Sequence, residues 1–166
     1  MIVDREAIVR LFRELQDAFP HLSMQLQLHD RHVDLNMDIP PQPGLTFFMN
    51  LNLQGDALHL SAGSFWLEWS PCTRSAIVDQ YRDAVTGLLS GRYRILEHYI
   101  GAWAVKAQLQ RPEADGWQTI GTWANLGTAV PWPRRRRVLR NVAGEGGAAS
   151  QADAADEAQG GTRTVS

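Results

Sequence analysis

The spacing of hydrophobic residues predicts two amphipathic helices. Near the start of the chain, apolar residues recur with the helical period of about 3.6 residues, at Ile8, Leu11, Phe12, Leu15 and Phe19. A second stripe of the same period extends over residues 77–89. Ser70 and Pro71 favour a helix start close to them, because a hydroxyl can cap the first backbone N–H groups and proline suits the first helical position.

Elsewhere, apolar and polar residues alternate with the two-residue period of half-buried strands. The alternation predicts strands at residues 24–28, 33–39, 45–54, 58–69, 92–99, 103–110 and 117–123. The strand at 58–69 contains Gly63, where we expect a bulge or a bend. The turn of the hairpin formed by 92–99 and 103–110 falls at residues 100–102, and its loop length is left open.

The order of elements, α-β-β-β-β-α-β-β-β, indicates an α+β fold. Consecutive short strands without helical crossovers favour an antiparallel sheet with both helices packed on one face. We expect one domain over residues 1–130 and a disordered tail over 131–166, because the tail lacks the apolar side chains needed to offset its ordering entropy. A short helix around 135–142 is the alternative for part of that tail.

Composition and charge narrow the classes of protein. The chain is 44% hydrophobic with a net charge of −2, and it holds a single cysteine, so no intrachain disulfide can form. Residues 1–133 carry ten basic and fourteen acidic side chains, which makes the predicted domain acidic and argues against nucleic acid as its main partner. The charged start and the lack of about 18 consecutive apolar residues predict no signal peptide, no membrane span and a cytoplasmic location.

The polar side of the first strands is the first candidate binding surface. If these strands pair, one surface collects Gln25, Gln27, Asp34, Asn36, Asp38, Asn50, Asn52 and, from the fourth strand, His59. A solvated sheet face is the commoner interpretation of such a pattern. Solvated faces are usually richer in Lys, Glu, Arg and Thr, however, so the bias toward Asn, Gln and Asp favours recognition of a partner or a sugar.

The last predicted hairpin is the second candidate. With a three-residue loop, Arg92, Arg94 and His98 share one strand face with Lys106, and that face can bind an anion or an acidic partner. A two-residue loop exchanges the faces, because a register change of one residue moves every side chain to the other side. The commoner outcome is a cationic strand face opposite acidic neighbours.

Tryptophan is frequent in this chain, with six residues. Trp103, Trp117 and Trp123 fall on the apolar side of their strands and are predicted to lie in the core. Trp66 lies in the same phase as Glu68, and Phe65, Leu67 and Trp69 lie in the other. Either phase can be the buried one, so we expect one large aromatic side chain to be exposed, and Trp66 is the one included among the predicted binding residues. An exposed tryptophan beside polar residues is a common anchor of protein interfaces.

Signals for catalysis or metal binding are weak. His29 and Asp30 lie with His32 at a hairpin turn, but their spacing matches no strong metal motif, and we predict no metal and no cofactor. Cys72 follows the predicted helix start, where the helix dipole can lower a thiol pKa, and His59 or His98 is its candidate base. No nucleophile elbow and no phosphate-binding loop are present.

These observations predict a non-catalytic protein-binding domain, such as an adaptor, a chaperone-like protein or an inhibitor of the immunity-protein kind, that binds through a polar sheet face. The predicted binding residues are Asp34, Asn36, Asp38, Asn50, Asn52, His59, Trp66, Arg92, Arg94 and His98. The alternative is a small-molecule-binding protein or a hydrolytic enzyme that uses His29, His59, His98 or Cys72. A third hypothesis is nucleic-acid binding through the arginine run formed by Arg134, Arg135, Arg136 and Arg137.

Overall fold

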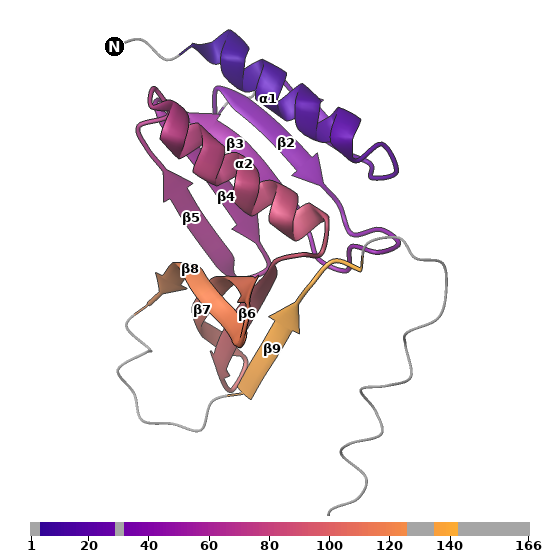
Figure 1. The fold of residues 1–166 in the computed structure, drawn as a ribbon, viewed down its shortest axis with the longest axis vertical. Coiled ribbons are helices and arrows are strands. Elements are labelled where there is room, and N and C mark those ends of the chain that lie inside the picture. Colours follow the sequence, from indigo (N-terminus) through magenta and orange to yellow (C-terminus); the bar gives the residue numbers. More distant parts are fainter. Residues whose placement is uncertain (1–3, 29–31, 126–134, 143–166) are drawn as a thin grey trace, which may run out of the picture.

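The structure is a computed structural model that describes residues 4–28, 32–125 and 135–142 (Figure 1). Its helices are α1 (Arg5–Ala18) and α2 (Ser75–Leu89). Its strands are β1 (Gln25–Gln27), β2 (Leu35–Ile39), β3 (Met49–Gln54), β4 (Ala57–Ala62), β5 (Phe65–Trp69), β6 (Arg94–Ile100), β7 (Trp103–Glu113), β8 (Gly116–Ala124) and β9 (Arg135–Leu139).

The strands form two antiparallel sheets. A five-stranded sheet has the order β1-β2-β3-β4-β5, and a four-stranded sheet has the order β8-β7-β6-β9. The predicted α+β class and the antiparallel pairing are confirmed. The strands divide between two sheets, however, because the chain leaves the first sheet through α2 and the later strands pair only among themselves.

Both helices lie side by side on one face of the five-stranded sheet, as predicted (Figure 1). Helix α1 begins where Asp4 accepts a hydrogen bond from the backbone N–H of Ala7, at 3.1 Å, which is the usual role of an aspartate cap. Its apolar stripe is buried against the sheet. On the outer sides of the helices, an ion pair at 3.2 Å joins Glu14 of α1 to Arg82 of α2.

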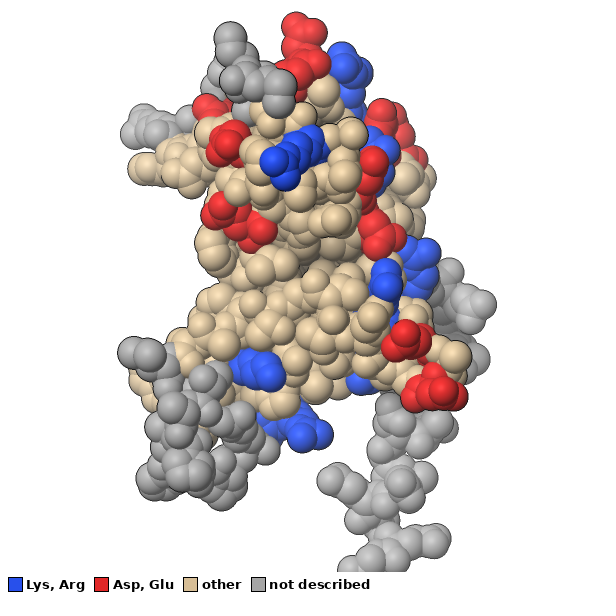
Figure 2. Space-filling view, turned by 60° about the vertical axis from the view of Figure 1, so that its left-hand side comes forward, with Lys and Arg blue, Asp and Glu red and all other residues tan. Residues whose placement is uncertain are grey.

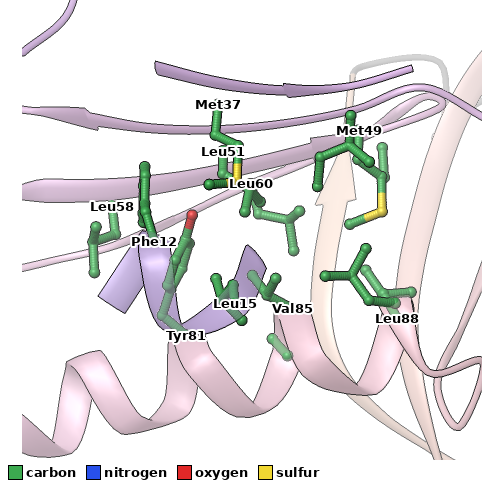
Figure 3. Packing of buried hydrophobic residues seen from close by; sticks show 14 of the residues in the cluster. Phe12, Leu15, Met37, Met49, Leu51, Leu58, Leu60, Tyr81, Val85 and Leu88 are labelled. Carbon is green, nitrogen blue, oxygen red and sulfur yellow. The ribbon is translucent and has the colours of Figure 1, made fainter. Parts of the chain in front are cut away.

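The main core lies between these helices and the sheet (Figure 3). The strand register aligns Met37, Leu51 and Leu60 in one row that faces the helices. Tyr81 of α2 reaches into this core, and its hydroxyl donates to the carbonyl of His59 at 3.0 Å. Full burial of a leucine, methionine or phenylalanine side chain contributes about 1.5–3 kcal/mol to folding stability, relative to leaving it exposed.

Two local predictions need correction. The strand expected at 58–69 is a hairpin of two strands, β4 and β5, with Gly63 at φ +57° in its turn. Helix α2 begins at Ser75 with Arg74 at its N-cap, so Ser70 and Pro71 precede the helix and their peptide bond is cis.

The hairpin of β6 and β7 combines a two-residue turn with a bulge. The turn pairs Ile100 with Trp103, whereas beyond the bulge His98 pairs with Lys106, which leaves Val105 as the extra residue. Because of the extra residue, residues 94–98 of β6 lie on the faces that the three-residue loop predicts. Arg94 and His98 therefore share one face with Lys106.

Strand β9 lies in the segment for which the sequence predicts a tail. It pairs antiparallel with β6, and its Leu139 is buried. Beyond the strand, the side-chain amide of Asn141 donates to the carbonyl of Leu89, and the Val142 N–H donates to the carbonyl of Gly44 at 2.8 Å. Residues 135–142 are therefore part of the folded region and are not a helix. The rest of the predicted tail, with Arg134, lies outside the described residues.

The four-stranded sheet packs against the β5 side of the five-stranded sheet. Gly121 of β8 marks the close approach, because a Cβ there would lie 2.8 Å from Cδ2 of Leu67. Glu97 of β6 adds a polar link, since its carboxylate accepts from the Ser64 N–H at 2.6 Å. The outer faces of the two sheets remain as separate candidate surfaces.

Candidate functional site

The outer face of the five-stranded sheet, on the side away from the helices, carries two rows of polar residues. The strand register aligns one row as Gln25, Asp38, Asn50, Ser61 and Trp66, and the next as Gln27, Asn36, Asn52, His59 and Glu68. We call these residues the polar face. The structure thus brings together most of the side chains that the sequence assigns to the first candidate surface.

Amide side chains in the middle of the polar face bond to one another. The Asn50 side-chain amide donates to Asn36 Oδ1 at 2.6 Å and to Asp38 Oδ1 at 2.7 Å. The Asn52 amide donates to Asn50 Oδ1 at 2.8 Å. All four side chains are half-buried. The bonds fix their orientations, so the remaining donors and acceptors point outward in a defined pattern.

An aromatic pair ends the polar face on the β5 side. The rings of His59 and Trp66 stack with their centroids 5.4 Å apart and an interplanar angle of 28°. His59 is 8% exposed, whereas Trp66 is 46% exposed, so the phase of Trp66 and Glu68 is the exposed one of the two that the sequence allows. The stack holds the indole ring in one orientation, which lowers the entropy that a partner must remove on binding.

The charge of the polar face is negative. It contains the carboxylates of Asp38 and Glu68 and no lysine or arginine. Asp34 lies at the end of the same strand side, but its carboxylate accepts from the Gly55 N–H at 2.8 Å, which makes it part of the turn between β3 and β4. A partner of this face therefore meets amide groups, two carboxylates and one indole ring.

The second predicted group, Arg92, Arg94 and His98, is divided by the structure. Arg92 lies outside the sheet and forms an ion pair with Asp83 at 2.9 Å. Arg94 and His98 lie on the outer face of the four-stranded sheet. Burial, followed by the nearby charge of Arg140, lowers the pKa of Arg94.

The tryptophans follow their predictions only in part. Trp103 is 80% exposed at the turn between β6 and β7, which corrects the prediction that it lies in the core. Trp117 is half-buried, and the Arg94 guanidinium lies 4.0 Å from its ring centroid. Trp123 packs against the core as predicted, although it is only partly buried. The alternation of β7 is interrupted by the bulge, and this explains why Trp103 faces outward.

The candidate catalytic residues lie on separate surfaces. Cys72 is buried beside the groove between the helices and precedes α2, so burial and the charge of Asp56 raise the pKa of its thiol instead of lowering it. His59 belongs to the polar face and His98 to the outer face of the other sheet. These residues therefore do not form a nucleophile–base pair, and His29 with Asp30 lies outside the described residues.

The sequence did not predict the positions that three residues take in the fold, although Arg136 belongs to the arginine run named above. Glu97 is completely buried, and Arg136 and Arg140 extend the outer face of the four-stranded sheet through β9. The weak signal for β9 was the alternation that puts Leu139 and Asn141 on one side. Four consecutive arginines concealed it, because such a run usually indicates a solvated segment.

Neither metal binding nor a membrane span is indicated by the described part of the chain. There, no group of three or more His, Cys, Asp or Glu side chains is placed to hold a metal ion. Neither described helix combines the length and the apolar character needed to cross a membrane. No protein-family model, no curated protein and no solved structure matches this chain.

Proposed function

We propose that this protein is a non-catalytic binding domain, of the adaptor, chaperone or inhibitor type, that recognises another protein through the polar face. The observation that carries the proposal is the row of mutually bonded amides that ends at the exposed, stacked Trp66. An ordered polar surface with one protruding aromatic side chain has the composition of a protein interface, in which a few aromatic residues contribute most of the binding energy.

The shape of the site favours a macromolecule over a small ligand. Small molecules bind in concave pockets that enclose most of their surface. The polar face is the open side of a sheet, and the groove that the structure shows lies elsewhere, between α1 and α2. A protein surface can cover the sheet face and can exclude water around Trp66.

The chemistry of the face indicates what the partner presents. The Asn36, Asn50 and Asn52 side chains supply both donors and acceptors, which match backbone amides and polar side chains. Asp38 of β2 and Glu68 of the edge strand β5 attract lysine or arginine on either side of Asn50 and Asn52. We therefore expect a partner surface that is polar, carries basic residues and offers an apolar contact for the indole ring.

The test compares two variants of the polar face with a matched control in affinity capture from a lysate of the native host. Asn50→Arg places a cation in the middle of the amide row, and Trp66→Ala removes the anchor. Trp103→Ala removes an exposed tryptophan from a different surface. Circular dichroism first establishes that all three chains are folded.

We expect a protein that is retained by the wild-type chain and by Trp103→Ala and is lost from Asn50→Arg and Trp66→Ala. Loss of one anchor tryptophan typically weakens an interface by about 2 kcal/mol or more, which is at least about thirtyfold in affinity. The proposal fails if the wild-type chain retains no protein, or if both variants of the polar face retain the same protein as the control.

A further inference from the structure

A second surface, on the outer face of the four-stranded sheet, carries the opposite charge. Its strand positions alternate with the buried ones, and the register aligns Arg136 with His98 and Lys106 in one row and Val138 with Leu96 and Gln108 in the next. Arg140 and Arg94 follow in a third row, because Leu139 pairs with Ile95. We call Arg94, Leu96, His98, Lys106, Gln108, Arg136, Val138 and Arg140 the cationic face.

The lysine and arginine side chains of this face form no ion pair with a carboxylate of the described residues. No carboxylate lies within 4.0 Å of a charged nitrogen of Arg94, Lys106, Arg136 or Arg140, although three ion pairs form elsewhere in the described part of the chain. The described positions of β6, β7, β8 and β9 that alternate with the buried ones and form this face hold no Asp or Glu. The exposed Glu113, at the end of β7, lies in the other phase of that strand. In Figure 2 the lower part of the molecule, which this sheet forms, is mostly uncharged, with basic groups along its lower edge and both basic and acidic groups at its right-hand end.

Two of these cations are held close together by one aromatic ring. The guanidinium carbons of Arg94 and Arg140 lie 4.0 and 5.5 Å from the ring centroid of Trp117. The Arg140 Nε also donates to the Gly91 carbonyl at 2.6 Å, which fixes this side chain. Two positive charges held beside one ring repel each other, and an anion bound between them offsets this repulsion.

Hydrogen bonds connect the rows and fix the side chains before any partner binds. Arg94 Nε donates to Gln110 Oε1 at 2.9 Å, and the amides of Gln110 and Gln108 both donate to Thr119 Oγ1, at 3.3 and 3.2 Å. Gln108 Oε1 lies 3.2 Å from His98 Nε2. Arg94 and His98 are therefore held by one continuous network, and little ordering of these two side chains remains on binding.

From these observations we infer that the cationic face binds an acidic segment of a protein, in which apolar side chains lie between carboxylates. The two cationic rows are separated by four residues along the strands, which is about 13 Å. Between them lie Leu96, which is half-buried, and Val138, which is 48% exposed. Carboxylates of the segment pair with the outer rows while its apolar side chains cover Leu96 and Val138.

The same features disfavour nucleic acid as the occupant. Single strands bind through aromatic rings on which bases stack. The ring of Trp117 is covered by Arg94 and Arg140, and the centre of the face is aliphatic. This inference goes beyond the proposed function because it concerns a different sheet and a ligand that is acidic where the partner of the polar face is basic.

The test measures fluorescence anisotropy of a labelled peptide of about twelve residues that alternates glutamate and leucine, long enough to span both rows. The full chain is titrated into this peptide, into the matching lysine–leucine peptide and into a thymidine oligonucleotide of about twelve nucleotides. The variants are Arg94→Gln with Arg140→Gln, and the charge reversal Arg136→Glu at an exposed position. Arg92→Gln is the control, because Arg92 pairs with Asp83 away from this face.

We expect the acidic peptide to bind the wild-type chain, Arg92→Gln and Trp66→Ala equally, and to bind both cationic-face variants at least about tenfold more weakly. Binding should weaken as salt is raised, since charge pairs at a surface are screened. The inference is overturned if the wild-type chain does not bind the acidic peptide, if Arg136→Glu binds it unchanged, or if the oligonucleotide or the basic peptide binds as tightly. Because Trp66→Ala retains peptide binding, failure here is separable from failure of the polar face.

Discussion

Glu97 is an ionisable residue in an environment that excludes water. It is completely buried where the two sheets meet, and its carboxylate accepts from the Ser64 N–H at 2.6 Å and from the Tyr99 hydroxyl at 2.9 Å. Ser64 Oγ lies 3.2 Å from the same tyrosine hydroxyl. A buried carboxylate is tolerated only when its oxygens are bonded, and here the bonds also link β6 to the turn between β4 and β5.

Replacing this carboxylate should destabilise the fold without an effect on either outer face. Glu97→Ala leaves the Ser64 N–H and the Tyr99 hydroxyl without their acceptor, and each unmade buried hydrogen bond costs about 1–3 kcal/mol. We expect the free energy of unfolding in urea to fall by about 2–4 kcal/mol. Glu113→Ala, an exposed position at the end of β7, is the control. Equal midpoints for the two variants would contradict the structural role of Glu97.

Tyr81 predicts a loss of stability at alkaline pH. Complete burial raises the pKa of its hydroxyl well above the ordinary value of about 10. Above pH 10 the unfolded tyrosine loses its proton while the folded one keeps it, so the unfolded state binds fewer protons and stability falls as pH rises. Burial raises the pKa of Tyr93 and Cys72 as well, and these groups act in the same direction.

Urea unfolding measured at about pH 8 and at about pH 11 checks this prediction. The wild-type midpoint should decrease between the two values, and the decrease should be smaller in Tyr81→Phe, which cannot ionise. Tyr81→Phe itself lowers the midpoint at both pH values, because the hydrogen bond to the His59 carbonyl is lost. An equal decrease in both chains would show that Tyr81 is not responsible.

Among the elements, helix α2 shows how a local signal can mislead. Ser70 and Pro71 have the residue types of a helix start, but Ser70 Oγ donates to Glu68 and the helix begins at Ser75. Arg74 occupies the N-cap with an extended backbone, and it makes no side-chain cap bond. The helix thus begins with uncapped N–H groups and with a cation near the positive end of its dipole.

Arg74→Asp should stabilise the protein. The aspartate can accept a hydrogen bond from the first turn and places a negative charge at the positive end of the dipole, which together are worth about 1–2 kcal/mol. A higher urea midpoint than wild type is the expected result. Ser70→Ala is the companion variant and should leave the free energy of unfolding within about 0.5 kcal/mol of wild type, since Ser70 does not cap α2. If Ser70→Ala lowered the midpoint and Arg74→Asp did not raise it, the result would indicate that the helix starts at Ser70.

The hairpin of β6 and β7 shows a different limit of prediction at the scale of elements. Alternation of apolar and polar residues predicts which residues of one strand share a face, and it did so for Arg94 and His98. It left open whether Lys106 of the neighbouring strand joins them. It does not predict the bulge at Val105. The extra residue shifts the alternation on one side of the bulge and leaves it unchanged on the other. Trp103 lies on the side where the phase changed, so its predicted burial was wrong.

At the scale of the whole molecule, the described residues share one hydrophobic core although they form two sheets. The cluster of buried residues under the helices continues to Ile95, Ala107 and Leu109 of the four-stranded sheet and to Leu139 of β9. Strand β9 is held at both sides, by pairing with β6 and by the bonds of Asn141 and Val142 to the helix end and to the Gly44 loop. We therefore expect the two sheets to unfold together.

Leu139→Ala tests this cooperativity. Removing a buried leucine side chain costs about 2–5 kcal/mol, and the loss should lower the stability of the whole domain. Tryptophan fluorescence and far-UV circular dichroism should give coincident urea transitions in the wild-type chain and in the variant. Val138→Ala, its exposed neighbour, should cause little change. Separate transitions by the two probes would show that the sheets are independent units.

The sequence by itself determined the helical stripes, most strand faces and the polar face, because each depends on a short-range period that separates solvent from core. Met37 and Leu51 were thus predicted inside, and Asn36 and Asn50 outside. Only the tertiary structure decided that the strands form two sheets, that β9 joins β6, that Glu97 is buried and that Arg140 meets Arg94 over Trp117. These features arise from contacts between residues far apart in the chain, and local periodicity contains no information about which strands pair.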